Sequence, residues 1–139
     1  METGKAYRKL IAFQRADNLV ATIYQATKDL PQEELLGLVL HMRHVAYSIP
    51  IHIADGYTKA TRREFYLGVK IACSSLAELE YFVDLTLRLG YITAGMHSKL
   101  SNEIDATARS LHGLLAGLKQ EPESERTLAE APAYYALAV

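Results

Sequence analysis

The feature that most constrains this chain is a set of four long segments whose apolar residues recur every three or four positions. Proline and glycine interrupt the sequence at only a few points, and no segment shows the strict alternation that is typical of a strand. We therefore predict an all-α protein. Four helices of roughly 20–28 residues with short connections predict an antiparallel, up-down-up-down four-helix bundle over residues 1–119.

The first two segments are separated by Pro31 and run from about Arg8 to Leu30 and from about Glu33 to Tyr57. Their predicted inward stripes are Phe13, Ala16, Val20, Ile23, Tyr24 and Thr27, then Leu35, Leu38, Met42, Val45, Ile49 and Ile53. Pro50 lies inside the second segment, where its missing N–H and its ring predict a kink. Because the stripe keeps its phase through Pro50, we favour one bent helix over two.

The last two segments have clear start and stop signals. Thr61 is the predicted N-cap of the third, with Glu64 three residues later, and Gly90 is the predicted stop. Thr93 is the predicted cap of the fourth, which reaches about Lys119. Their inward stripes are Phe65, Val69, Ala72, Leu76, Leu79, Val83 and Leu87, then Leu100, Ile104, Leu111, Leu114, Leu115 and Leu118.

Charge is distributed unevenly along the chain, although the net charge is only −1. Residues 1–119 carry 14 basic and 12 acidic residues, whereas residues 120–139 carry one basic and four acidic residues. The predicted bundle is therefore mildly basic, and residues 120–139 are predicted to be an acidic, alanine-rich tail. The chain as a whole lacks the basic excess that is typical of a nucleic-acid-binding domain.

Cellular context is constrained by what the sequence lacks. Cys73 is the only cysteine, which excludes an intramolecular disulfide and a cysteine-rich zinc cluster. No stretch has the pattern of a signal peptide or the apolar length of a membrane span, so we expect a cytoplasmic protein without membrane contact.

A second apolar stripe on the third segment predicts self-association. It lies roughly opposite the inward stripe and consists of Leu67, Ile71, Phe82, Leu85 and Leu89. Five large apolar side chains on one exposed face would usually mark an interface. The alternative is that the first segment or the tail covers this stripe.

Polar side chains on the second segment gather within about 80° of one another on a helical projection. They are His41, His44, Ser48, His52 and Asp55, called here the polar seam. Because His41 and His52 would lie about 16 Å apart along a helix, they cannot share one metal ion. Each i, i+3 pair would need further ligands from elsewhere, so we favour a hydrogen-bonded seam and predict no metal, no cofactor and no catalytic residues.

A basic cluster is predicted at the turn between the second and third segments. Lys59, Arg62 and Arg63 form it, and Arg43 and Lys70 are candidates to lie nearby. Three cations in five residues are suited to phosphate contacts. Cations at the start of a helix interact unfavourably with the helix dipole, so their presence there slightly favours a binding role. The simpler interpretation is that they are the solvated end of a helix.

From Tyr7 to Lys119 the chain resembles the bacterial 23S rRNA intervening-sequence protein family. Eight residues of the second segment match the family's motif there, namely Arg43, Ala46, Ser48, Ile49, Pro50, Ile53, Ala54 and Gly56. The third segment matches at Glu64, Phe65, Ile71, Ala72, Ser75, Leu76, Glu78, Leu79 and Glu80, and Leu89, Gly90 and Tyr91 match the family's usual ending. His41, His44, His52 and Asp55 depart from the motif, as does Ser74.

The resemblance implies a four-helix bundle that assembles into a ring, typically of five subunits, without an established enzymatic activity. It also implies a fold similar to the accessory variability determinant of diversity-generating retroelements, which works with a reverse transcriptase and nucleic acid; that likeness does not transfer function. Our leading hypothesis is a non-enzymatic, cytoplasmic homo-oligomer that acts as a binding or scaffolding module for RNA or a nucleic-acid enzyme. The alternative is a structural or protein-interaction scaffold.

Overall fold

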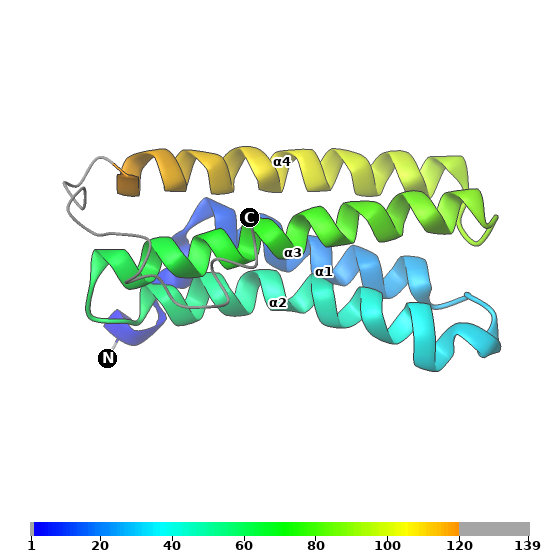
Figure 1. Ribbon diagram of the computed structural model, residues 1–139, viewed down its shortest axis with the longest axis horizontal. Coiled ribbons are helices and arrows are strands. Elements are labelled where there is room, and N and C mark those ends of the chain that lie inside the picture. Colours follow the sequence, from blue (N-terminus) through cyan, green and yellow to red (C-terminus); the bar gives the residue numbers. More distant parts are fainter. Residues whose placement is uncertain (1, 120–139) are drawn as a thin grey trace, which may run out of the picture.

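The computed structural model describes residues 2–119, which are helical nearly throughout and contain no strand (Figure 1). The helices are η1 (Glu2–Lys9), α1 (Ile11–Thr27), η2 (Gln32–Glu34), η3 (Leu35–Val39), α2 (Leu40–Tyr57), α3 (Arg62–Arg88) and α4 (Ala94–Lys119). The predicted all-α class and the four main helices are confirmed. The predicted acidic tail, residues 120–139, lies outside the described residues.

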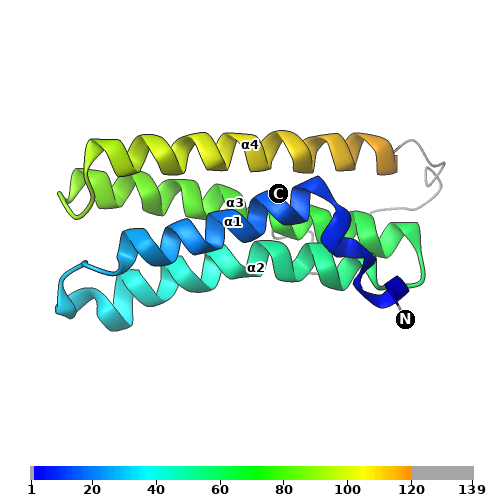
Figure 2. The ribbon, with the colours of Figure 1, turned by 180° about the vertical axis from the view of Figure 1, so that it is seen from behind.

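The four α helices lie side by side as a bundle (Figures 1 and 2). Each packs against two others: α2 contacts α1 and α3, and α4 contacts α3 and α1. The short connections place consecutive helices next to each other, as expected for a bundle. Within the described residues, no helix is both long enough and apolar enough to cross a membrane.

The caps of α3 and α4 confirm the start and stop signals read from the sequence. The backbone N–H of Glu64 donates to the Thr61 hydroxyl at 3.1 Å, and the backbone N–H of Met96 donates to the Thr93 hydroxyl at 3.0 Å. At the end of α3, Gly90 has φ +77°, a left-handed conformation that glycine adopts without strain. The N–H of Tyr91 then donates to the carbonyl of Thr86, which completes a Schellman motif.

The start of the second predicted helix is irregular. In place of one α helix from Glu33, the chain forms a short 3₁₀ turn and a π-helical segment, and regular α geometry begins only at Leu40. Leu35, which we predicted to face inward, is 52% exposed, because the changed helical pitch rotates it out of phase with the core. Pro50 lies buried inside α2, which continues without a break to Tyr57, so the interpretation as one helix is correct.

The core face of α1 differs from the predicted stripe. Its buried positions are Ala12, Ala16, Leu19, Thr22, Ile23, Ala26 and Thr27. Tyr24, predicted to face inward, is 41% exposed, whereas Leu19 is completely buried. The prediction favoured large side chains, but α1 approaches its neighbours through alanines, which shifts the buried face toward Leu19. The inward stripes of α3 and α4 agree with the prediction, with their outermost members only half-buried.

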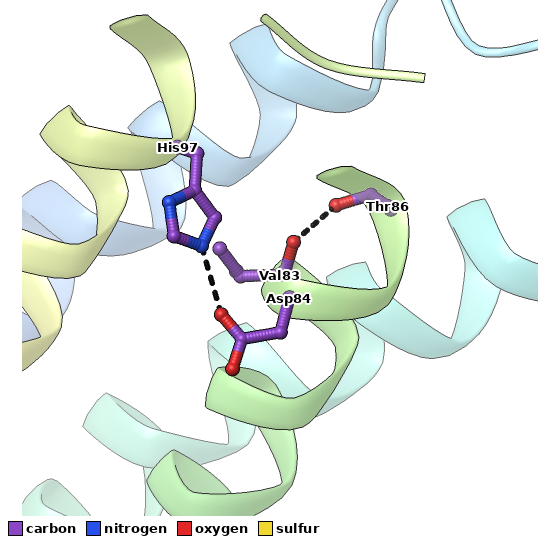
Figure 3. A network of polar contacts seen from close by, with 4 residues as sticks. All are labelled: Val83, Asp84, Thr86 and His97. Carbon is purple, nitrogen blue, oxygen red and sulfur yellow. Dashed lines mark hydrogen bonds and ion pairs between the residues drawn. The ribbon is translucent and has the colours of Figure 1, made fainter. Parts of the chain in front are cut away.

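Four buried threonines retain hydrogen bonds within their own helices. The hydroxyls of Thr22, Thr27 and Thr107 each donate to the carbonyl four residues earlier, and the Thr86 hydroxyl donates to the Val83 carbonyl at 2.7 Å (Figure 3). Because each hydroxyl is satisfied locally, burying it does not leave an unpaired polar group.

Two side-chain contacts secure the end of the bundle that holds the α3–α4 turn. His97 of α4 lies 2.8 Å from the carboxylate of Asp84 on α3 (Figure 3). The Tyr91 hydroxyl donates to Glu34 at 3.0 Å, which ties the turn to the irregular start of the second helix. The first contact holds the end of α3 against α4, and the second holds the turn after α3 against η2.

Candidate binding surface

The two central residues of the polar seam, Ser48 and His52, form hydrogen bonds, and Ser48 contacts α3. The Ser48 hydroxyl lies 2.7 Å from the carbonyl of Val45 and 2.8 Å from the hydroxyl of Ser75 on α3. A hydroxyl has only one hydrogen, so when Ser48 donates to Val45, Ser75 donates to Ser48. Nδ1 of His52 lies 2.7 Å from the Ser48 carbonyl, which can only accept. Nδ1 therefore carries the proton, and Nε2 of neutral His52 is an acceptor.

The outer members of the seam do not join this centre. His41 is exposed, and its ring stacks on that of Phe82 of α3 with 6.5 Å between the ring centres. His44 is also exposed and packs edge-on against Tyr47, with 5.4 Å between the ring centres. Asp55 is exposed and pairs with Lys59 at 3.5 Å. Within residues 2–119 no group of three or more His, Cys, Asp or Glu side chains is arranged to hold a metal ion.

Two glycines let α2 and α3 approach closely beside the seam. A Cβ at Gly68 would lie 2.7 Å from the carbonyl oxygen of His52 and 3.1 Å from Cα of Gly56. A Cβ at Gly56 would lie 3.3 Å from Cα of both Gly68 and Phe65. Contacts this short to backbone atoms cannot be relieved by turning a side chain. Glycine at both positions therefore sets the distance between the two helices.

A hollow of about 240 Å³ opens next to this crossing. It is lined by His52, Asp55, Gly56, Lys59, Glu64, Leu67, Gly68 and Ile71. The hollow brings the C-terminal end of the polar seam, one cation of the basic turn and two members of the second apolar stripe together. Sequence reasoning treated these as three separate features.

The cations of the turn between α2 and α3 have protein contacts. Nη2 of Arg62 donates to the carbonyl of Gly117 at 2.8 Å, near the end of α4. This places a positive charge at the negative end of the α4 dipole, which offsets its unfavourable position at the start of α3. Arg63 and Lys70 are half-buried and also have interaction partners. Lys59, Arg62, Arg63 and Lys70 thus lie on or near one end of the α2–α3 pair.

Arg43 does not join that cluster. It lies sixteen residues before Lys59, roughly 24 Å away along a helix. Its Nε donates to the Thr27 hydroxyl at 2.9 Å, and its guanidinium lies 4.4 Å from the centre of the Tyr24 ring. Arg43 therefore connects α2 to α1, and the structure does not bring it together with the other candidate residues.

Cys73 is half-buried on α3. Burial raises the pKa of its thiol, while the positive charge of Lys70 works in the opposite direction. A raised pKa lowers the fraction of reactive thiolate at neutral pH, which is typical of a packing residue rather than a nucleophile.

The second apolar stripe of α3 is less exposed than predicted. Leu67, Ile71, Phe82 and Leu85 are half-buried, and Phe82 and Leu85 pack against the core of their own bundle. Only Leu89, at 50%, is clearly exposed. Phe82 and Leu85 therefore serve the fold of the single chain as well as any interface.

Sequence reasoning missed a more exposed apolar stripe on the second helix. Leu36, Leu40 and Ile51 are 82%, 53% and 52% exposed. Leu40, Tyr47 and Ile51 share one outward face of α2 together with His44, because their spacing alternates between three and four residues. Its helical spacing is present in the sequence, directly beside the polar seam.

Comparison with protein families gives a match, and comparison with curated proteins gives none. The matching family is described as 23S rRNA-intervening sequence protein, and it covers residues 8–113. This range includes α1, α2, α3 and most of α4, and thus the polar seam, the two glycines and the basic turn. The chain belongs to the 23S rRNA-intervening sequence protein family.

Proposed function

We propose that this protein is a non-enzymatic, cytoplasmic homo-oligomer of five subunits that binds RNA as an accessory module. The proposal rests on one observation about the side formed by α2 and α3. This side exposes apolar residues and carries a group of cations at one end. The family description names a 23S rRNA intervening sequence, and the cations at this end are the observation that favours RNA as the partner.

The assembly part of the proposal rests on exposed apolar surface. Leu36 of η3, Leu40 and Ile51 of α2, and Leu89 directly after α3 are all at least half exposed. Burying a leucine or isoleucine side chain contributes about 1.5–3 kcal/mol, so association gains from covering them together. Five subunits in a ring is what the family resemblance implies for such an interface.

The binding part rests on charge. Each subunit supplies Lys59, Arg62, Arg63 and Lys70 at one end of the α2–α3 pair. A ring repeats this group once per subunit, and repeated weak contacts raise the overall affinity for a long polyanion. Arg62 keeps its positive charge while it donates to the Gly117 carbonyl, so it still adds to the positive potential that attracts a polyanion.

We also infer an up-down-up-down helix order and a bend at Pro50. Short connections and the packing of each helix on the next support the first inference. The colours of Figure 1 change in opposite directions along consecutive helices, which agrees with it. The second inference follows from the missing N–H of Pro50, which leaves the Ala46 carbonyl without its usual helical donor.

The test is a titration of structured RNA and of DNA by fluorescence anisotropy, at low and moderate salt. The full chain is compared with Lys59→Gln/Arg62→Gln/Arg63→Gln. The control is Lys28→Gln/Lys99→Gln/Arg109→Gln, which removes three exposed cations from other surfaces. We expect the first variant to lose at least tenfold in affinity and most of the salt dependence, and the control to change little.

Circular dichroism of both variants verifies that the helices remain intact. No RNA binding at low salt by the folded wild-type protein would contradict the proposal, as would equal losses in the two variants. In the first case the scaffold alternative, in which the α2–α3 side contacts only other proteins or other subunits, becomes the working function.

A further inference from the structure

The end of α4 lies beside the start of α3, at the end of the bundle that carries the basic turn (Figure 1). Nη2 of Arg62 donates to the carbonyl of Gly117 at 2.8 Å, which holds the last turn of α4 next to the cations of this turn. The α4 helix ends at Lys119. The chain that follows α4 therefore starts beside the basic turn of its own subunit.

The residues that follow α4 have the opposite charge. Residues 121–130, called here the acidic segment, contain four glutamates and one arginine, a net charge of −3. Residues 55–70 contain four basic and two acidic side chains, a net charge of +2. One of the acidic side chains, Asp55, pairs with Lys59 at 3.5 Å in an exposed ion pair, which is worth little and can exchange partners. Opposite charge on two neighbouring segments favours contact between them.

The acidic segment is long enough to reach the cations of this end. Its first glutamate, Glu121, follows Gly117 by four residues, which an extended chain spans over at most about 14 Å. Lys70, the farthest of the four cations on α3, follows Arg62 by eight residues, about 12 Å along the helix axis. A segment that is attached this close to its target has an effective concentration of about millimolar, so even a weak contact is populated.

We propose that the acidic segment docks on the basic turn and Lys70 of its own chain and competes with RNA for these cations. The glutamate carboxylates accept charge-assisted hydrogen bonds from the lysine ammonium groups and from the guanidinium of Arg63. RNA phosphates require the same donors, so RNA has to displace the segment, which lowers its apparent affinity. The competition rests on the proposed function, whereas the docking does not.

The docking is tested by carbodiimide cross-linking of the full chain, which joins a carboxylate to an amine in direct contact with it. We expect peptides that link Lys59 or Lys70 to a glutamate of the acidic segment, in a yield that falls at high salt, which screens the charges. Lys28 after α1 and Lys99 near the start of α4 are exposed controls and should give no such link. Cross-linking of unlabelled chains refolded together with isotope-labelled chains separates links within one chain from links between subunits.

The competition is tested by fluorescence anisotropy with structured RNA at about 0.1 M salt, where charges more than roughly 10 Å apart are largely screened. The test variant neutralises the acidic segment by Glu121→Gln, Glu123→Gln, Glu125→Gln and Glu130→Gln. The control variant makes the same change in net charge at exposed positions elsewhere, by Asp17→Asn, Asp29→Asn, Glu33→Gln and Asp105→Asn. We expect the test variant to bind RNA about threefold more tightly than the wild type, or better, and the control to change less than about twofold.

Circular dichroism verifies that the wild type and both variants are folded. The docking is overturned if the folded wild type gives no link from Lys59 or Lys70 to the acidic segment, or gives such links only between subunits. Equal RNA affinities of the wild type and the test variant would overturn the competition. If neither of them binds RNA, the proposed function fails and the competition fails with it, while the cross-links still decide the docking.

Discussion

The two sides of the bundle are built differently. Where α2 meets α3, Gly56 and Gly68 bring the backbones together, and the outer surface carries exposed apolar residues and cations. Where α1 meets α4, alanines line a hollow that is open to solvent, and a carboxylate oxygen of Glu103 is buried without a donor among the described residues. The first side therefore has the exposed apolar residues and cations on which the proposed function depends.

The largest expected effect concerns the close approach of α2 and α3. Gly68→Ala should lower the free energy of unfolding by about 1–3 kcal/mol, because its Cβ would lie 2.7 Å from the His52 carbonyl oxygen. Gly113→Ala on α4 is the control, since its Cβ meets nothing within 4 Å. Alanine favours helix over glycine by about 1 kcal/mol, so this control should be stabilising. Chemical denaturation measures both, and a stabilising Gly68→Ala would show that the helices are not in close contact.

A smaller effect should come from the hydrogen bond between Ser48 and Ser75. Ser48→Ala should lower the free energy of unfolding by about 0.5–1.5 kcal/mol, because the half-buried Ser75 hydroxyl loses its partner. A double-mutant cycle with Ser75→Ala isolates the pair from other losses. Ser98→Ala, at an exposed position of α4, is the control and should have little effect. Strict additivity of the two seam substitutions would contradict a direct bond.

The smallest expected effect is a pH dependence at the α3–α4 turn. The hydrogen bond to Glu34, followed by desolvation and the charges of Glu34 and Glu33, raises the pKa of Tyr91. The neutral phenol is therefore favoured in the folded state. Its contribution is present below the pKa of an unfolded tyrosine, about 10, and is lost as pH rises through the folded pKa. Unfolding measured across this alkaline range should show a loss for the wild type that is reduced in Tyr91→Phe.

Local sequence was sufficient to predict the helices and most of their ends. Thr61, Thr93 and Gly90 act through atoms within a few residues of themselves, so their roles can be read without knowledge of the fold. The irregular start of the second helix was not predicted. Its geometry is tied to a distant contact, the bond from Tyr91 to Glu34.

The candidate sites were predicted less well, because they depend on which helix faces are neighbours. Arg43 was grouped with the basic turn by charge alone, whereas its actual partners, Thr27 and Tyr24, lie on α1. The polar seam was found from helical spacing, but the pairing of Ser48 with Ser75 needs the register between two helices. Glu103 resembles any other helical glutamate in the sequence, and only the packing of α1 on α4 reveals its unpaired oxygen.

The measurement that tests the central claim most directly is the molecular mass in solution, by sedimentation velocity. The claim is that the α2–α3 side is the contact surface of this protein. We expect the wild type to sediment as a homo-oligomer and Leu40→Glu/Ile51→Glu, which places charges in the exposed stripe of α2, to sediment as a folded monomer. Ile11→Glu, at an exposed apolar position of α1, should keep the wild-type mass. A monomeric wild type, or a double variant that retains the wild-type mass, would contradict the claim.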